Sequence, residues 1–148
     1  MIYTDMTKLA LRLCFDAHRG QTDRGELPYV YHPLHLAEQM HDESTVIVAL
    51  LHDVVEDTEY DLEDLERRGF GREVLDALEL LTHDDSTCYM DYIAAIRDNP
   101  IARTVKLADL KHNSDLSRLN KITPEDRQRV RKYQRAQAIL EDDGYGPV

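Results

Sequence analysis

The segment that most constrains the fold is 44–58, STVIVALLHDVVEDT. Its apolar residues would surround a helix almost completely rather than form one stripe, and this pattern is typical of a helix buried at the centre of a protein. Valine and isoleucine also suit a strand, but the run is too long for a strand and no alternating partner segment occurs elsewhere. We therefore predict a single central helix over 44–58, with other elements packed around it.

Helical patterns along the rest of the chain supply those elements. Apolar residues at three- and four-residue spacing predict a helix over 2–18, whereas 19–31 contains two glycines and a proline and is expected to be a loop. Capping residues, prolines and glycines bound the further helices, which we expect from Pro33, over 61–68, 72–81 and 89–97, from Pro100 to about 116, and over 124–140. The sequence therefore predicts one all-α domain, 1–148, of about seven to eight helices, with a frayed tail at 141–148.

The charge of the chain limits its partners. The 148 residues carry a net charge of −11, which argues against binding to nucleic acid or to an anionic membrane surface, because both require a basic surface. The charge is uneven: residues 1–96 hold 7 Lys/Arg and 21 Asp/Glu, whereas 97–148 hold 11 and 8. An anionic small molecule would therefore prefer the second segment. The acidic helical surface permits a homo-oligomer without requiring one.

The start of the chain and its cysteines narrow the class of protein further. No charged-then-apolar leader occurs, and no apolar run approaches the length of about 18 residues that a membrane helix needs. We therefore expect a cytoplasmic protein with no membrane segment. Cys14 and Cys88 are the only cysteines, which excludes a disulfide framework and a Cys-based zinc site, and we expect both to be buried as small apolar residues.

Four polar residues interrupt the apolar central helix. They are His52, Asp53, Glu56 and Asp57. Burying so many ionisable groups costs several kcal/mol unless they pair with one another or bind a cation. Their spacings of three and four residues allow all four to face one cleft. A metal-binding or catalytic role is therefore favoured over a set of satisfied hydrogen bonds.

Two residues elsewhere have side chains that could join this cluster. His32 directly precedes Pro33, which restricts its backbone and places it at the mouth of a helix, either as a ligand or as a cap of a neighbouring helix end. Asp109 interrupts an apolar stretch in VKLADLKHN (105–113), either as a ligand or as the partner of Lys106.

Taken together, these residues form a ligand set for an open metal site. His32, His52, Asp53 and Asp109 offer two imidazoles and two carboxylates, which suit Mn²⁺, Fe²⁺ or a similar ion and leave positions for water and a phosphate oxygen. Glu56 and Asp57 then lie where they could orient or deprotonate an attacking water and protonate a leaving oxygen. The residues therefore predict metal-assisted hydrolysis of a phosphate ester, without naming the ester.

Several motifs, in order along the chain, resemble the HD-domain hydrolases of the RelA/SpoT-homologue group, and in particular its small alarmone hydrolases. These motifs are AHRGQ (17–21), PYVYHP (28–33), ALLHDVVEDT (49–58), FG (70–71), LT (81–82) and VKLADLKHN (105–113). The resemblance covers residues 5 to about 118. It implies an HD-domain helical bundle with one divalent ion, usually Mn²⁺. It also implies hydrolysis of the 3′-pyrophosphate of guanosine, or adenosine, tetra- and pentaphosphates.

The resemblance also implies roles for individual residues. The metal ligands would be His32, His52, Asp53 and Asp109, the catalytic residues Glu56 and Asp57, and the substrate-binding residues Arg24, Tyr29, Lys106 and Asn113. Two departures concern base recognition: Asp23 stands where relatives usually have a basic residue, which would place a negative charge at the substrate mouth, and SDLSRL (114–119) differs from the usual stretch.

Two alternative functions remain open from the sequence. An HD-type phosphohydrolase could act on another nucleotide, such as a nucleoside monophosphate or the 2′-phosphate of NADPH, and would release orthophosphate. A non-catalytic module could keep the site only to bind a nucleotide. The basic stripe Arg127, Arg129, Arg131, Lys132 and Arg135 is expected to be a solvated helix face, with a wall that attracts phosphates as its alternative.

Overall fold

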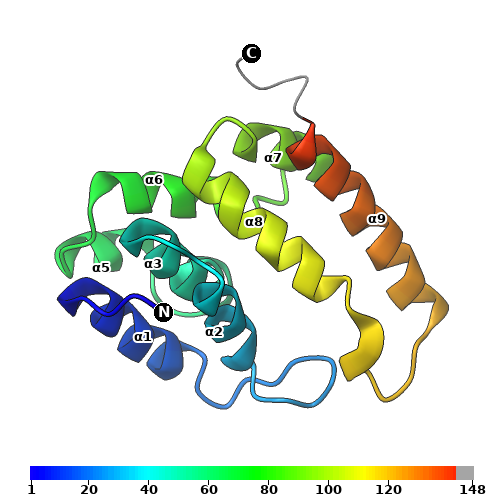
Figure 1. The fold of residues 1–148 in the computed structure, drawn as a ribbon, viewed down its shortest axis with the longest axis horizontal. Coiled ribbons are helices and arrows are strands. Elements are labelled where there is room, and N and C mark those ends of the chain that lie inside the picture. Colours follow the sequence, from blue (N-terminus) through cyan, green and yellow to red (C-terminus); the bar gives the residue numbers. More distant parts are fainter. Residues whose placement is uncertain (143–148) are drawn as a thin grey trace.

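The computed structural model describes residues 1–142, which form a bundle of helices (Figure 1). In chain order the elements are α1 (Asp5–Ala17), α2 (Tyr31–Glu38), α3 (Glu43–Leu51), α4 (Val54–Asp57), α5 (Leu62–Arg67), α6 (Arg72–Leu81), α7 (Tyr89–Ile96), α8 (Pro100–Asn113), the 3₁₀ helix η1 (Leu116–Arg118) and α9 (Pro124–Glu141). Within 1–142 the only β-type pairing is an isolated bridge between Thr22 and Pro28. The predicted all-α class is confirmed. Of the frayed tail expected over 141–148, Glu141 instead belongs to α9, and residues 143–148 lie outside the described residues.

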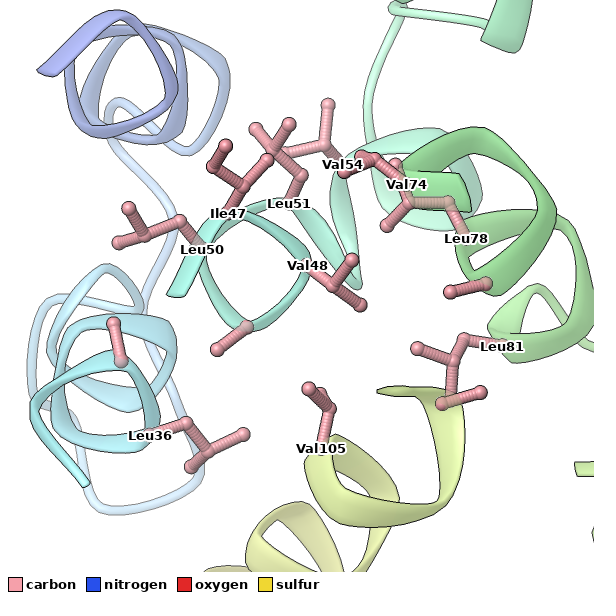
Figure 2. Packing of buried hydrophobic residues seen from close by; sticks show 14 of the residues in the cluster. Leu36, Ile47, Val48, Leu50, Leu51, Val54, Val74, Leu78, Leu81 and Val105 are labelled. Atoms are coloured by element: carbon pink, nitrogen blue, oxygen red, sulfur yellow. The ribbon is translucent and has the colours of Figure 1, made fainter. Parts of the chain in front are cut away.

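The central position predicted for the 44–58 segment is confirmed for α3. Every residue of α3 from Thr45 to Leu51 is buried, and the helix packs against α1, α2, α6 and α8. Figure 2 shows side chains from three of these helices around it: Leu36 from α2, Leu78 from α6 and Val105 from α8. Burial on all sides explains why α3 lacks a polar stripe.

The predicted single helix over 44–58 is wrong in one respect, because it breaks at His52 and Asp53 between α3 and α4. The His52 side chain explains the break. Its Nδ1 lies 2.7 Å from the Ala49 carbonyl oxygen, the acceptor that the Asp53 N–H would use in a continuous α-helix. The break therefore places His52 and Asp53 at the junction of two helices.

Local capping explains where the flanking helices begin. The Asn99 side chain accepts a hydrogen bond from the Ala102 N–H and is followed by Pro100 in the first turn of α8. Thr123 and Asp126 form a reciprocal capping box at the start of α9. These two helices run side by side in Figure 1, and they carry the basic part of the chain.

Two further findings qualify the sequence predictions. Helix α8 ends at Asn113, and η1 follows as a separate turn rather than as a continuation to residue 116. Cys14 is buried as expected, but Cys88 is exposed at the start of α7, so its predicted burial is wrong. Among the described residues, no helix combines the length and the apolar character needed to cross a bilayer.

Candidate active site

Two histidines and two aspartates converge from three parts of the chain. His32 lies in the first turn of α2, His52 and Asp53 lie at the break between α3 and α4, and Asp109 lies in α8. His32 Nε2 is 2.8 Å from Asp109 Oδ1, and His52 Nε2 is 3.0 Å from Asp53 Oδ2. The cross distances are 3.5 Å from His52 Nε2 to Asp109 Oδ1 and 4.0 Å from His32 Nε2 to Asp53 Oδ2. The structure therefore brings together the ligand atoms of all four residues predicted to bind a metal.

The chemistry of this donor set fits a divalent cation. Because the His52 Nδ1–H donates to the Ala49 carbonyl, Nε2 is the ring nitrogen that faces the two carboxylates. His52 Nε2 is buried and has no hydrogen-bond partner within residues 1–142. Buried polar atoms rarely lack a partner, so this nitrogen, aimed between two aspartates, marks a position suited to a cation.

Hydrogen bonds from three other residues hold the carboxylates in place. The Tyr29 hydroxyl donates to Asp53 Oδ2. Lys106 Nζ lies 2.8 Å from Asp109 Oδ2, and Asn113 Nδ2 lies 3.0 Å from Asp109 Oδ1. Tyr29, Lys106 and Asn113 are three of the four residues predicted to bind substrate, and here they contact the predicted metal ligands. The pairing of Asp109 with Lys106, kept open from the sequence, is present alongside the contact with His32.

Charge at the centre of the site keeps both aspartates ionised. Burial opposes ionisation of Asp109, but Lys106 and then His32 outweigh it and hold the pKa of this carboxyl well below its usual value. In the same way the neighbouring His52 lowers the pKa of Asp53 to about 2 despite its burial. Burial would lower the pKa of His52, yet the charges of Asp53 and Asp109 raise it well above its usual value. The site therefore favours positive charge at the point between these residues.

Glu56 and Asp57 stand beside this centre in α4. Their carboxylate oxygens lie within 4.8 Å of one another and of an oxygen of Asp53. Glu56 Oε1 accepts a hydrogen bond of 3.2 Å from the His83 N–H, which fixes its position. Partial burial and the charge of Asp53 raise the pKa of both carboxyls. A carboxylate whose pKa is raised toward neutrality is suited to accept and return a proton.

A cavity of about 650 Å³ opens above these residues. Nine of the ten predicted site residues line it, and His52 lies behind Asp53. Its other walls come from the loop after α1, from η1 with its flanking residues, and from α9, which adds Thr22, Asp23, Gly25, Asp115, Leu116, Arg118, Leu119, Asp126, Arg129 and Tyr133. Of the five basic residues predicted as a stripe on α9, all within the described chain, Arg129 is the one that lines the cavity. The volume lies within the range of about 300–1,000 Å³ that is usual for small-molecule sites.

Contacts between the loop after α1 and the η1 segment, which lie near each other in Figure 1, join two walls of the cavity, and this side is here called the cavity mouth. Asp23 Oδ2 pairs with Arg118 Nη1 at 2.9 Å, and Asp23 Oδ1 accepts hydrogen bonds from the Gly25 and Leu27 N–H groups. Arg118 Nη2 also lies 3.3 Å from the His112 carbonyl oxygen. Asp23 therefore does not present an unbalanced negative charge to the mouth, and the two sequence departures contact each other.

Comparison with known proteins identifies the family. Residues 10–139 match the family model described as HD domain. The chain belongs to the HD-domain family. Among the relatives of this HD domain, the bifunctional (p)ppGpp synthase/hydrolase SpoT of Escherichia coli K12 is 34% identical over 78% of this chain and 18% of SpoT. The guanosine-3′,5′-bis(diphosphate) 3′-pyrophosphohydrolase of Haemophilus influenzae is 35% identical over 79% of this chain and 19% of that enzyme.

A solved structure of a SpoT orthologue matches this chain over a larger share of both chains. A metazoan orthologue of SpoT that hydrolyses ppGpp superimposes with a TM-score of 0.78 and 27% identity, covering 96% of this HD domain and 89% of that chain. This match confirms the predicted HD-domain bundle. The curated bacterial relatives are much longer, and this chain spans a fifth of their length or less.

Sequence reasoning on this HD domain missed the contribution of α9 and η1 to the cavity. Arg129 belongs to the basic stripe, for which a phosphate-attracting wall was the less favoured alternative. Tyr133 lies four residues further along the same helix and also lines the cavity. An i,i+4 spacing places such residues on one face of a helix, which is the signal that singles out these two from the stripe.

Proposed function

We propose that this chain is a metal-dependent hydrolase that removes the 3′-pyrophosphate from guanosine or adenosine tetra- and pentaphosphates. One observation carries this proposal: two imidazoles and two carboxylates converge at the floor of a nucleotide-sized cavity, directly beside Glu56 and Asp57. The names of the bacterial relatives and the activity of the metazoan SpoT orthologue support this choice of substrate. We also propose that residues 1–148 act as one catalytic domain.

The ion we propose for this site is Mn²⁺, held by His32, His52, Asp53 and Asp109. A set of nitrogen and carboxylate ligands without thiolate suits Mn²⁺ and similar ions better than a closed structural zinc site. When bound, such an ion lowers the pKa of water and neutralises charge on a phosphate. The hydrogen bonds from Lys106 and Asn113 to Asp109 would keep that carboxylate oriented toward the ion.

Glu56 and Asp57 would move the protons of the reaction. Water attacks the phosphorus next to the 3′-oxygen, and the bond from this phosphorus to the 3′-oxygen breaks. We assign Glu56 as the carboxylate that accepts a proton from the attacking water, because His83 fixes one of its oxygens. Asp57 would supply the proton that the leaving 3′-oxygen takes up. The products are pyrophosphate and a nucleotide with a free 3′-hydroxyl.

The remaining wall residues would bind the nucleotide. Arg24 and Arg129 line the cavity from the loop and from α9, where their charges can attract the phosphates. Lys106 carries its charge at the floor and is paired with Asp109. Tyr29 donates to Asp53, so its contribution to substrate binding would come from the ring it presents to the cavity.

Product analysis tests the proposal. The purified protein is incubated with Mn²⁺ and, in parallel, with guanosine tetraphosphate, its adenosine counterpart, nucleoside monophosphates and NADPH. We expect pyrophosphate from the 3′-pyrophosphates and no orthophosphate. Orthophosphate from a monophosphate or from NADPH would show that the substrate is that nucleotide rather than the alarmone. Tight nucleotide binding without any product would indicate a binding module.

Two variants show whether the product comes from this site. Glu56→Gln removes the proposed proton acceptor and is expected to reduce turnover by about 10²-fold or more, while Mn²⁺ still binds. Glu59→Gln changes an exposed glutamate three residues further along and is the matched control. Equal loss in the two variants, or full activity in Glu56→Gln, would remove Glu56 from this role.

A further inference from the structure

The two histidines at the proposed metal site are oriented by different kinds of acceptor. His52 donates its Nδ1–H to a main-chain oxygen of its own helix, that of Ala49, at 2.7 Å. His32 has no such main-chain partner for its Nδ1 among the bonds of the described residues. Instead its Nδ1 lies 2.7 Å from Nδ1 of His112, a residue of α8 that is 80 positions away in sequence.

The geometry of this contact is that of a hydrogen bond in the plane of both rings. The ring planes of His32 and His112 are 7° apart, and their centroids are 5.0 Å apart. In rings stacked face to face, the two Nδ1 atoms would lie in different planes. Nearly parallel planes with centroids 5.0 Å apart and Nδ1 atoms 2.7 Å apart instead place the two rings edge to edge. Both side chains are buried, with 3% of His32 and 7% of His112 exposed. Water therefore does not compete for either nitrogen.

The direction of the bond follows from the role of His32. Its Nε2 faces Asp109 Oδ1 at 2.8 Å and, in the proposed function, offers a lone pair to the ion. A neutral imidazole carries one N–H, which must then be on Nδ1. His32 therefore donates, and His112 accepts at Nδ1 and keeps its own proton on Nε2.

We propose that His112 is a positioning residue of the metal site, which holds His32 in the tautomer and orientation that present Nε2 to the ion. The inference rests on the proposed function, because it requires His32 to be a ligand. His112 lies three residues after Asp109, so one face of α8 supplies both a carboxylate ligand and the acceptor that orients an imidazole ligand.

Neighbouring groups hold the His112 ring in place. The His35 ring packs against it with centroids 4.3 Å apart, and Tyr31 lies at 5.8 Å. Its main-chain carbonyl accepts from Arg118 at the cavity mouth. These contacts fix the position of the acceptor, and Nδ1 of His112 makes the contact with the proposed ligand His32.

A calorimetric titration of the metal-free protein with MnCl₂ measures Mn²⁺ affinity and tests this role without reference to turnover. His112→Phe keeps a ring but cannot accept the hydrogen bond, and we expect Mn²⁺ affinity to fall by about 10- to 100-fold. His112→Asn places an amide oxygen near the position of Nδ1 and is expected to recover most of that loss. His35→Phe keeps a ring that can pack against His112 and leaves the hydrogen bond to His32 intact, so its affinity should stay close to that of the natural protein.

The outcomes separate the two proposals. Wild-type affinity in His112→Phe would overturn the positioning role alone, provided that the natural protein binds Mn²⁺. The same would follow if His112→Asn were as weak as His112→Phe, because acceptance of the hydrogen bond would then not matter. If the natural protein bound no Mn²⁺, the metal role of His32 and this inference would both fail. Circular dichroism of each metal-free variant identifies any loss of affinity that comes from unfolding.

Discussion

At the scale of single residues, the site combines charges that oppose folding with charges that support it. Lys106 offsets Asp109, and the Tyr29 hydroxyl satisfies Asp53. Within residues 1–142 neither Glu56 nor Asp57 forms an ion pair of this kind, and both carry raised pKa values because of partial burial and the charge of Asp53. Functional sites often keep such unfavourable groups at a cost in stability.

This balance predicts how the stability of a Glu56→Gln variant depends on pH. A carboxyl whose pKa is raised in the folded state destabilises it where the group is ionised, at neutral pH and above, and the penalty disappears as the pH falls through the raised pKa. In the metal-free protein we therefore expect Glu56→Gln to raise Tm at pH 8 by up to about 3 °C, a small value because the side chain is partly exposed. The gain should shrink toward pH 4.

Thermal unfolding in EDTA at a series of pH values provides the measurement, with Glu59→Gln as the control. The control should show no pH-dependent gain of this kind, since Glu59 is exposed and outside the cluster. A gain for Glu56→Gln that grew as the pH fell would contradict the proposed charge environment.

The individual site residues differ in how far the sequence revealed them. Polar residues on an apolar helix are costly, and this cost pointed to His52, Asp53, Glu56 and Asp57. The role of His112 depends on a contact across 80 positions, and nothing in its local pattern distinguishes it from a surface histidine. Tyr29 lines the cavity while its hydroxyl donates to Asp53, and this contact is also a property of tertiary structure.

At the scale of elements, boundaries set by local signals were predicted well. Thr123 and Pro124 mark the start of α9, and Asn99 and Pro100 the start of α8, because capping requires only neighbouring residues. The break between α3 and α4 was missed. It depends on the rotamer that directs the His52 ring to the Ala49 carbonyl, and the apolar pattern continues across it.

The contact between the loop after α1 and η1 leads to a prediction for Gly25. A β-carbon at this position would lie 2.6 Å from the Arg118 carbonyl oxygen, a main-chain atom that can move only if the loop or η1 shifts. Gly25→Ala should therefore destabilise the protein by about 1–3 kcal/mol. It should also raise KM more than it lowers kcat, because the cavity mouth is displaced while the metal ligands are not.

Gly71→Ala is the matched control for this substitution. Apart from its chain neighbours, no atom of residues 1–142 lies within 4 Å of a β-carbon at Gly71, and the φ of −76° at this position is open to any residue. Its cost should be confined to the N-cap position of α6, at about 1 kcal/mol or less. Urea denaturation measures the stability of both variants, and steady-state kinetics measure their KM and kcat. Equal effects on KM would show that Gly25 has no special role at the mouth.

The capping box of α9 gives a second prediction at this scale. The Thr123 hydroxyl accepts from the Asp126 N–H, and the Asp126 carboxylate accepts from the Thr123 N–H. Thr123→Ala should cost about 1 kcal/mol, whereas Thr123→Ser keeps the hydroxyl and should cost much less. Urea denaturation of the two variants measures the difference. If alanine and serine were equally tolerated, the hydroxyl would not contribute to the start of α9.

At the scale of the whole molecule, the uneven charge of the sequence is reproduced across the cavity. The acidic first segment supplies one base, Arg24, and four acids to its lining, whereas the second segment supplies three bases and three acids. The bases of the second segment are Lys106, Arg118 and Arg129. The sequence favours the second segment for an anionic ligand, and this stays a prediction. It could not predict that α9 lines the cavity with Arg129 and Tyr133, since this depends on how α8 and α9 pack.

A bound ion would connect elements that are far apart in sequence. Its proposed ligands come from α2, from the junction of α3 and α4, and from α8, so binding requires the native arrangement of all three. An ion that binds only the folded state stabilises it by about 2.7 kcal/mol at a concentration one hundred times Kd. For a chain of this size we expect Mn²⁺ to raise Tm by about 5–10 °C above the value in EDTA.

Asp109→Asn should abolish most of this rise. Because the change also leaves the partly buried Lys106 without its charged partner, the metal-free variant is expected to be less stable than the natural protein. The rise in Tm on adding Mn²⁺ must therefore be measured for each variant against its own metal-free form. Asp91→Asn, at an exposed position of α7, should retain the full rise. An undiminished rise in Asp109→Asn would show that the ion stabilises the fold from some site other than the one built by α2, α3 and α8.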